Sequence, residues 1–248
     1  MKNWYKHLPN TITLLNLTSG CVAVVFAMGG EPGTAALFIL LASVFDFLDG
    51  FTARLLKAYS EIGKQLDSLA DMVSFGVAPG MIAFVLMKEA IPGVNMSLSA
   101  IHTSPWNWIL LASPFLIPAF SALRLAKFNI DERQTVNFIG MPTPANAILW
   151  ASFGLMVQFG DYPEIPVLIF TATNILIVVI FTSLLLVSEL PMFSLKFAGL
   201  SLYANWFRYL FLLAALLLLI FMGVYGLPLV ILLYIALSVI FYLLKVDF

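Results

Sequence analysis

Long apolar runs recur along this chain, and they restrict its fold more than any other feature of the sequence. Between Trp206 and Leu244, for example, the only charged residue is Arg208. Over the whole chain 62% of the residues are hydrophobic and 10% are charged, whereas a soluble domain is about half apolar and about a quarter charged. A soluble fold of 248 residues cannot hide so much apolar surface from water. The sequence therefore predicts an integral membrane protein.

The apolar runs are continuous, which favours membrane-spanning helices over a β-barrel. Barrel strands would alternate apolar and polar residues over segments of about ten, whereas a membrane helix needs roughly 20 mostly apolar residues. Clusters of glycine and proline mark the ends of the runs. We therefore expect an all-α membrane protein, a single polytopic domain over residues 1–248 with about eight transmembrane helices. The helices are predicted at residues 12–29, 34–57, 63–88, 107–127, 142–160, 164–188, 206–224 and 227–245.

Basic residues are distributed very unevenly between the two ends of these helices. One end carries only Lys88, and the other carries the remaining eleven: Lys2, Lys6, Arg54, Lys57, Lys64, Arg124, Lys127, Arg133, Lys196, Arg208 and Lys245. Cytoplasmic loops of membrane proteins carry an excess of Lys and Arg. We therefore expect a multi-pass protein of the cell (inner, cytoplasmic) membrane. Both termini and the polar ends of the second and third helices would face the cytoplasm.

Four of the seven aspartates are concentrated inside or beside two neighbouring apolar helices. An ionised carboxylate in a bilayer costs about 3 kcal/mol or more unless it faces a polar cavity or a partner. Asp46 and Asp49 are three residues apart, and Asp67 and Asp71 are four apart, so each pair shares a helix face. A single aspartate could simply be salt-bridged to a neighbouring helix, but only Arg54 is close to these four. The cluster therefore indicates a functional site with excess negative charge.

Excess negative charge in a site of low dielectric constant requires cations. Carboxylate oxygens suit Mg²⁺ or Mn²⁺, and the absence of nearby His or Cys argues against zinc. Such sites commonly bind phosphate and neutralise charge on a transferring phosphoryl group. Gly50, Ala53 and Gly63 share the same helix faces and leave room for a ligand, whereas we expect Lys57 and Lys64 to be solvated. The segment predicts a divalent-metal site for phosphate chemistry, and we expect no nucleic-acid partner.

This segment resembles the signature of the CDP-alcohol phosphotransferase family at every fixed position. The matching residues are Asp46-x2-Asp49-Gly50-x2-Ala53-Arg54-x8-Gly63-x3-Asp67-x3-Asp71. The resemblance implies an enzyme that displaces CMP from a CDP-linked donor with an alcohol hydroxyl, at a metal site between membrane helices. It also implies a six-helix catalytic core over about residues 8–190, followed by two further helices over about 206–245, and a homodimer.

The same resemblance implies a role for each residue of the signature. Two Mg²⁺ or Mn²⁺ ions would be held by Asp46, Asp49, Asp67 and Asp71. Asp71 would also be the catalytic base that removes the proton of the acceptor. The CDP-linked donor would be bound by Gly50, Ala53, Arg54, Gly63 and Asn16.

Three further segments, at residues 8–20, 68–79 and 121–145, resemble the phosphatidylserine synthase branch of this family. This resemblance implies CDP-diacylglycerol as the donor, L-serine as the acceptor, and phosphatidylserine and CMP as the products. Serine carries a carboxylate, and an arginine can bind a carboxylate with two hydrogen bonds. We therefore expect Arg124 to bind serine, with Ser74 as a second candidate.

Each of these polar residues also has a simpler explanation. Arg124 lies at a depth where arginine commonly anchors a helix to lipid phosphates, and we expect Lys127 and Arg133 to be such anchors. Ser74 and Asn16 could instead hydrogen-bond across helices.

Two alternatives to the serine reaction remain open. The same chemistry could use another acceptor, such as glycerol 3-phosphate or inositol. The carboxylates could instead belong to the ion path of a cation transporter, but a transporter distributes its acids along a route through several helices. The four aspartates here lie at two adjoining helix ends.

Overall fold

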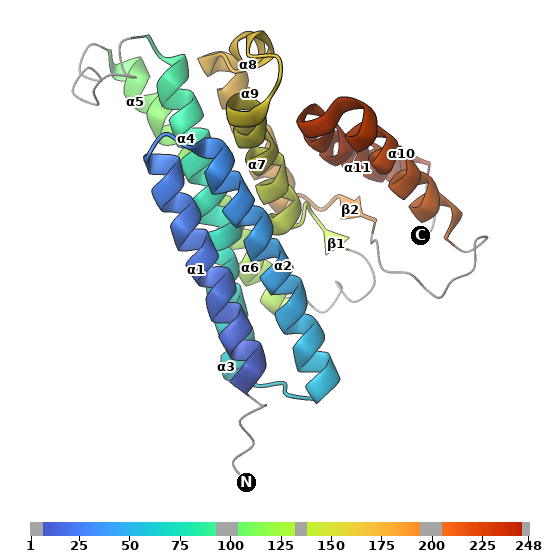
Figure 1. Cartoon of the computed structure of the whole chain (residues 1–248). Helices are drawn as coiled ribbons and strands as arrows, with labels where there is room; N and C mark the ends of the chain where they lie inside the picture. Colours follow the sequence, from blue (N-terminus) through green and yellow to red (C-terminus); the bar gives the residue numbers. More distant parts are fainter. Residues whose placement is uncertain (1–6, 93–103, 132–137, 194–204, 245–248) are drawn as a thin grey trace.

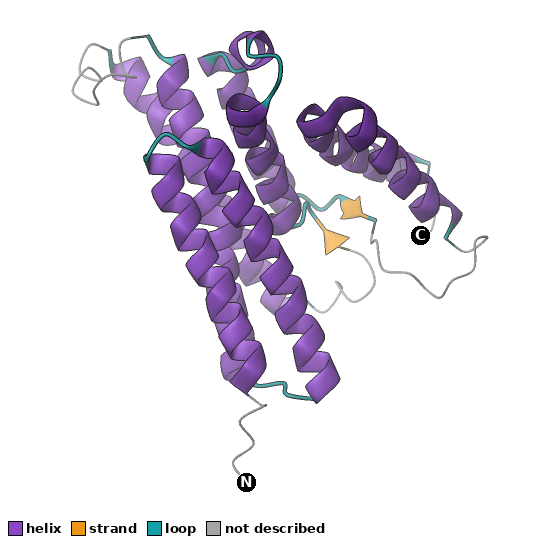
Figure 2. Cartoon of the chain, viewed as in Figure 1, coloured by secondary structure: helices purple, strands orange, loops and turns teal. Residues whose placement is uncertain are grey.

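The computed structural model describes residues 7–92, 104–131, 138–193 and 205–244, and these residues are almost entirely helical (Figures 1 and 2). The α-helices are α1 (Leu8–Met28), α2 (Pro32–Leu56), α3 (Glu61–Asp71), α4 (Ala78–Ala90), α5 (Pro105–Ala112), α6 (Leu116–Ile130), α7 (Thr143–Phe159), α8 (Glu164–Ile169), α9 (Ala172–Val187), α10 (Trp206–Met222) and α11 (Gly226–Leu243). A π-helical segment, η2 (Met72–Val77), joins α3 to α4, and the short helical turns η4 (Ser113–Phe115) and η5 (Gly223–Tyr225) join α5 to α6 and α10 to α11. Two short strands, β1 (Phe138–Ile139) and β2 (Pro191–Met192), complete the described part.

All eight predicted helices fall on helical segments, which confirms the all-α membrane fold. Five helical runs are long and apolar enough to cross a membrane, and α9 is a shorter apolar helix. These runs are Leu8–Met28, Pro32–Leu56, Glu61–Ala90, Pro105–Ile130 and Trp206–Leu243. The chain is therefore a multi-pass membrane protein. The number of crossings, eight, stays a prediction.

The prediction of one helix over residues 164–188 is wrong, because the chain breaks this segment into α8 and α9. The backbone of Phe170 leaves the helical region, with φ −89° and ψ 56°. The Thr171 side chain then accepts a hydrogen bond from the Asn174 amide at 3.3 Å and so caps α9. A helix cap inside an apolar run leaves the hydropathy of the run unchanged. A prediction from hydropathy therefore could not detect this break.

The last apolar run folds back on itself as a hairpin of α10 and α11 (Figure 1). Gly223 lies at the turn with φ +54° and ψ −129°, a conformation that a side chain would strain. A Cβ added to Gly226 would come within 2.8 Å of the Leu218 carbonyl carbon, so the two helices approach very closely there. The hairpin agrees with the two helices predicted after residue 206.

The core of the main bundle depends on small residues between α1, α2 and α7. Ala23, Ala27, Ala35 and Ala36 are fully buried. Lipid provides little hydrophobic drive for helix association, so helices in a membrane associate mainly through close van der Waals packing. At Gly154 of α7, an added Cβ would come within 2.9 Å of the Pro32 carbonyl carbon. The backbones of α2 and α7 therefore touch.

A second core joins the α10–α11 hairpin to α7 and β2. Its centre is Phe193, whose ring centroid lies 4.8 Å from that of Tyr234 and 5.5 Å from that of Phe211. The Tyr234 hydroxyl donates a hydrogen bond to the Phe193 carbonyl oxygen at 3.1 Å. Phe193 directly follows β2, which pairs antiparallel with β1. The hairpin thus holds the segment after α9 against the bundle.

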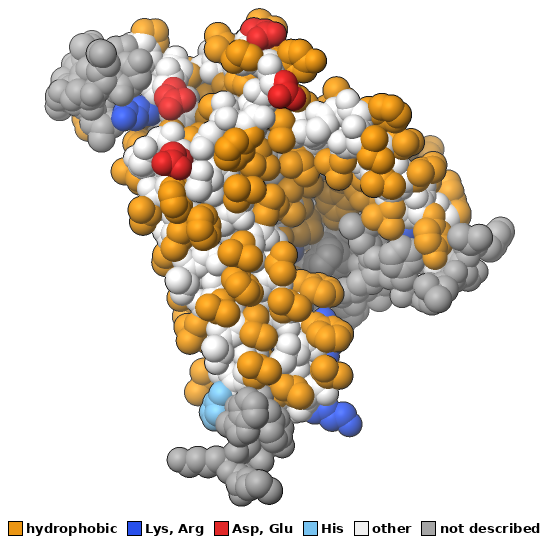
Figure 3. Space-filling model, in the orientation of Figure 1, with side chains coloured by type: hydrophobic (Ala, Val, Ile, Leu, Met, Phe, Trp, Pro, Cys, Tyr) orange, Lys and Arg blue, Asp and Glu red, His pale blue; other side chains and the backbone are white. Residues whose placement is uncertain are grey.

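Charged side chains lie mainly at the two ends of the bundle. Figure 3 shows acidic side chains at the upper end and basic side chains at the lower end, where α2 ends and α3 begins. Hydrophobic side chains cover most of the surface between them. Five of the basic residues used above to predict orientation, namely Lys2, Lys6, Arg133, Lys196 and Lys245, lie outside the described residues.

Candidate active site

The turn between α2 and α3 brings the aspartates of both helices to one end of the bundle. Lys57 ends α2 in the left-handed conformation (φ 50°), so the chain turns away from the helix. Ser60 then caps α3, because its hydroxyl accepts a hydrogen bond from the Gly63 amide at 3.0 Å. Asp46 and Asp49 of α2 and Asp67 of α3 therefore come close to one another.

Asp46, Asp49 and Asp67 form a cluster in which one carboxylate oxygen from each lies within 4.8 Å of the others. Asp49 is 6% exposed, and its Oδ2 atom is buried without a hydrogen-bond partner. A buried carboxylate oxygen without a partner is costly unless a cation approaches it. The donors are all hard oxygens, which Mg²⁺ and Mn²⁺ prefer. We call these three residues the carboxylate cluster, and it could hold a metal ion.

Asp71 lies beside the carboxylate cluster and is held by α1. Its carboxyl group is within hydrogen-bonding reach of Asp46. The Asn16 side-chain nitrogen donates a hydrogen bond to Asp71 Oδ1 at 3.2 Å. The Ser74 hydroxyl donates to the Asn16 carbonyl oxygen at 2.9 Å. Asn16 and Ser74 are both fully buried, so they support Asp71 from behind.

The helix changes from α to π directly after Asp71, a feature that the sequence did not reveal. A π-helical turn inserted into a helix often marks a functional site. Here it packs tightly on α1, since a Cβ added to Gly20 would come within 2.7 Å of the Ser74 backbone. This close approach fixes Asn16 relative to Asp71.

A cavity of about 600 Å³, which we call the Asp49 pocket, opens beside the carboxylate cluster. It is lined by most of the predicted site residues: Asp46, Asp49, Gly50, Ala53, Arg54, Gly63 and Asp67. It is also lined by residues that were not predicted, among them Asn10, Thr13, Tyr59, Ser60 and Phe128. Lys64, which we expected to be only solvated, lines it too and adds a second cation beside Arg54. Asn16 and Asp71 lie behind its wall.

Gly50 and Gly63 differ in what a side chain would meet. A Cβ on Gly63 would come within 2.9 Å of Ser60 Oγ and 3.0 Å of Asn10 Oδ1, so it would push these polar groups aside. A Cβ on Gly50 would make only an ordinary contact with the Arg54 guanidinium, at 3.5 Å. The packing is therefore tight at Gly63, whereas the packing around Gly50 has room for a side chain.

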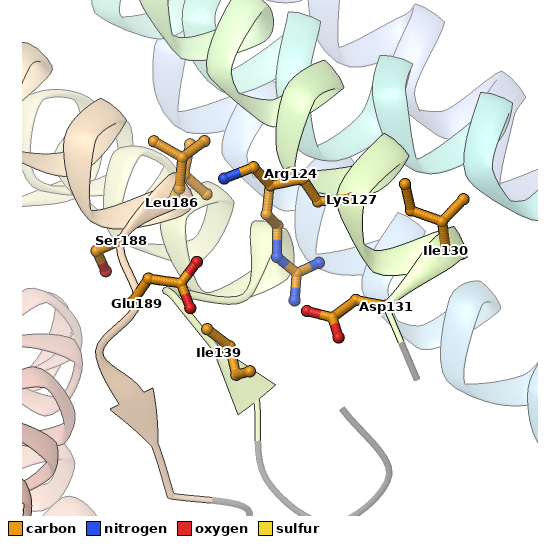
Figure 4. Close-up of a pocket in the computed structure, with 9 residues that line it drawn as sticks. Arg124, Lys127, Ile130, Asp131, Ile139, Leu186, Ser188 and Glu189 are labelled. Atoms are coloured by element: carbon orange, nitrogen blue, oxygen red, sulfur yellow. The ribbon is translucent and has the colours of Figure 1, made fainter. Parts of the chain in front are cut away.

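Arg124 lines a second cavity, of about 330 Å³, which we call the Arg124 pocket (Figure 4). Its wall combines the end of α6 with Ile139 of β1 and the segment that ends α9. The residues are Arg124, Lys127, Ile130, Asp131, Ile139, Leu186, Val187, Ser188 and Glu189. Lys127, which we expected to be a lipid anchor, lines this pocket, while Arg133 lies outside the described residues.

Arg124 stands between the two pockets. It is 6% exposed, and its Nη1 atom donates a hydrogen bond to the Thr143 hydroxyl at 3.4 Å. Its guanidinium carbon lies 5.2 Å from the centre of the Phe128 ring, and Phe128 lines the Asp49 pocket. Its charge also acts on Asp71. Arg124 is thus buried and lines a pocket, whereas Ser74 does not line that pocket.

The sequence held partial signals for the residues that were missed. Thr13 and Phe128 fall in segments whose resemblance to a known branch was noted above, although no role was assigned to them. Glu189 is an isolated acid directly after an apolar helix. Its distance in sequence from Arg124 concealed their shared pocket.

The sequence is similar to those of known proteins. The sequence model of the CDP-alcohol phosphatidyltransferase family matches residues 6–184. The CDP-diacylglycerol–serine O-phosphatidyltransferase of Mycobacterium leprae is 35% identical over 194 residues, which cover 75% of this chain and 57% of that protein. The protein of the same name from Bacillus subtilis is 38% identical over 138 residues, 56% of this chain and 70% of that protein.

An archaeal relative extends the comparison. The archaetidylserine synthase of Methanothermobacter thermautotrophicus is 31% identical over 160 residues, 64% of this chain and 60% of that protein. The chain spans less than two thirds of the length of this protein and of the mycobacterial relative. The family match nevertheless covers most of the chain, including every residue that lines the Asp49 pocket, whereas Leu186, Val187, Ser188 and Glu189 of the Arg124 pocket lie beyond it. The chain belongs to the CDP-alcohol phosphatidyltransferase family.

Proposed function

We propose that the protein transfers a phosphatidyl group from CDP-diacylglycerol to L-serine, giving phosphatidylserine and CMP. The observation that carries the proposal is the position of the carboxylate cluster. It lies in the wall of one pocket, and a second charged pocket lies just beyond Arg124 and Phe128. This arrangement supports neighbouring sites for the donor and for a charged acceptor. The names of the relatives, two for transfer to serine and one for an archaeal lipid of serine, support the acceptor.

The metal site of the proposal consists of Asp46, Asp49, Asp67 and Asp71, which together would hold two Mg²⁺ or Mn²⁺ ions. The buried Asp49 oxygen without a partner and the mutual approach of the carboxylates support this assignment. When bound, the ions would neutralise the donor diphosphate and stabilise CMP as it leaves.

The Asp49 pocket would receive the head group of the donor. Its volume of about 600 Å³ is in the range of pockets for small ligands and cofactors. Arg54 can pair with the diphosphate, and Gly50, Ala53 and Gly63 leave space for the cytidine. Phe47 lines the pocket and is 65% exposed, so it offers the acyl chains an apolar exit into the lipid.

In the proposed reaction the serine hydroxyl oxygen forms a bond to the phosphorus that bears the diacylglycerol. The bond from this phosphorus to the oxygen shared with CMP breaks, and CMP departs with the electron pair. Asp71 accepts the hydroxyl proton. Asn16 orients the Asp71 carboxylate from behind, since it is fully buried and hydrogen-bonded to it. Arg124 pairs with the serine carboxylate.

We further propose that the protein is a homodimer in the cell membrane, with both termini and the active site on the cytoplasmic side. Within the described residues, Arg54, Lys57 and Lys64 lie at the same end of the bundle as the carboxylate cluster, and basic ends face the cytoplasm. Labelling of single cysteines placed at Lys57 and Lys88 in intact cells tests this: only the second should react from outside. Light scattering in detergent tests the dimer.

Release of CMP by purified protein tests the reaction. The protein is incubated with CDP-diacylglycerol, Mn²⁺ or Mg²⁺, and one acceptor: L-serine, glycerol 3-phosphate or inositol. We expect metal-dependent CMP release with serine alone. Release with another alcohol but not with serine would overturn the acceptor. Cation flux into liposomes without CMP release from any acceptor would favour a transporter and overturn the enzyme.

A further inference from the structure

The proposed mechanism uses Arg124 but neither of the two acids that line the Arg124 pocket with it. Two cations, Arg124 and Lys127, and two acids, Asp131 and Glu189, line one cavity of about 330 Å³. A water occupies about 30 Å³ in the liquid, so the cavity has room for a small polar molecule. Figure 4 shows the carboxylates of Asp131 and Glu189 on opposite sides of the Arg124 guanidinium. Such a pocket suits a ligand that carries both charges.

The two acids come from different walls of the pocket. Asp131 follows α6 one turn after Lys127, and its amide donates to the Lys127 carbonyl oxygen at 3.0 Å. Asp131 is the C-cap of α6, and Figure 4 shows its carboxylate beside the Arg124 guanidinium. Glu189 faces α6 from the segment after α9, and it is exposed. Glu189 thus brings an acid to the pocket from the wall opposite α6.

The backbone around Glu189 is fixed by several contacts. The Gly140 amide donates to the Leu190 carbonyl oxygen at 2.8 Å, and the Met141 amide donates to the Leu185 carbonyl oxygen at 2.9 Å. Gly140 has φ +75°, and a Cβ there would come within 2.9 Å of the Ser188 carbonyl oxygen. The segment that carries Glu189 is thus held between β1 and α9 rather than free to swing.

We infer that the Arg124 pocket binds the amino-acid acceptor as a zwitterion, with Glu189 contacting its α-ammonium group and Arg124 its α-carboxylate. This inference rests on the proposed function and adds a residue that determines acceptor specificity. The hydroxyl then points past Arg124 and Phe128 toward the Asp49 pocket. The Glu189 carboxylate would attract the ammonium group of an amino acid and repel the phosphate of a phosphorylated acceptor. An uncharged polyol would gain no charge pair with it, so Glu189 would favour an amino acid over both other acceptors.

The test compares L-serine with 3-hydroxypropanoate, which has the same hydroxyl and carboxylate but lacks the ammonium group. In the Glu189→Gln variant of the full-length protein, we expect KM for serine to rise by about tenfold or more. The activity with 3-hydroxypropanoate and the KM for CDP-diacylglycerol should stay within about twofold of wild type. Glu164→Gln, at the start of α8, removes an acid far along the chain from both pockets and serves as the matched control.

Glu189→Asp keeps the charge on a shorter side chain, and its KM for serine should fall between those of wild type and Glu189→Gln. Three outcomes would overturn the inference: an unchanged KM for serine in Glu189→Gln, an equal loss with both acceptors, or a larger loss in Glu189→Asp than in Glu189→Gln. Failure of the proposed function has a different signature, because wild-type protein would then release no CMP with serine.

Discussion

The Asp49 pocket and the Arg124 pocket share a wall but differ in construction and charge. The first lies between the faces of α1, α2 and α3, and three carboxylates outnumber Arg54 and Lys64 there. The second joins the end of α6 to a largely non-helical segment, and its two cations balance two acids. The first suits a diphosphate with divalent cations, and the second suits a small zwitterion. Changes in the first pocket should therefore affect the chemical step, and changes in the second should affect the choice of acceptor.

Asp71→Asn should have the largest effect, because it removes the proposed base and leaves the shape of the site unchanged. We expect kcat to fall by about 10² to 10⁴-fold, with donor binding partly retained. CMP release and binding of CDP-diacylglycerol are measured on the same preparation. Asp161→Asn, in the loop between α7 and α8, is the matched control and should behave as wild type. Near-normal turnover in Asp71→Asn would refute its role as base.

Removal of the metal should have the next largest effect, because only the Asp49 pocket is proposed to hold metal ions. EDTA should abolish CMP release, and Mn²⁺ or Mg²⁺ should restore it. Bound ligand stabilises the folded state, so the cations should raise the unfolding temperature of wild-type protein. Asp49→Asn should lose most of this shift, because it removes the carboxylate whose buried oxygen has no hydrogen-bond partner. A full metal-induced shift in Asp49→Asn would show that the ions bind elsewhere.

The two pockets differ in how well the sequence predicts them, because one is formed mainly by a local segment and the other by segments that are distant in sequence. The four aspartates and Arg54 lie within one helix–turn–helix segment, so spacing and membrane energetics were enough to bring them together. Most of the helices were predictable for the same reason, because each is a local apolar run, but the break between α8 and α9 was not. The Arg124 pocket needs Glu189 to meet α6 across about 60 residues of chain. That meeting depends on the β1–β2 pairing and on the break before Thr171, neither of which has a hydropathy signal.

Arg124→Ala should weaken the use of serine without disabling the donor site. If the arginine pairs with the serine carboxylate while buried, its loss costs about 2–5 kcal/mol in kcat/KM for serine. The KM for CDP-diacylglycerol should change much less, which separates this variant from those of the carboxylate cluster. Lys88→Ala, at the opposite end of the bundle, is the control. An unchanged dependence on serine would return Arg124 to the role of a membrane anchor.

Tyr234→Phe should have the smallest effect and tests whether the α10–α11 hairpin serves one pocket or the whole bundle. The Tyr234 hydroxyl lies near Arg124 and donates to the carbonyl oxygen of Phe193, four residues after Glu189. A hydrogen bond of this kind contributes about 0.5–1.5 kcal/mol. If the hairpin only positions the wall that carries Glu189, the KM for serine should rise about two- to tenfold while the KM for CDP-diacylglycerol stays constant. If the KM for the donor rose equally, the hairpin would support both pockets, and the separation drawn between them would be wrong.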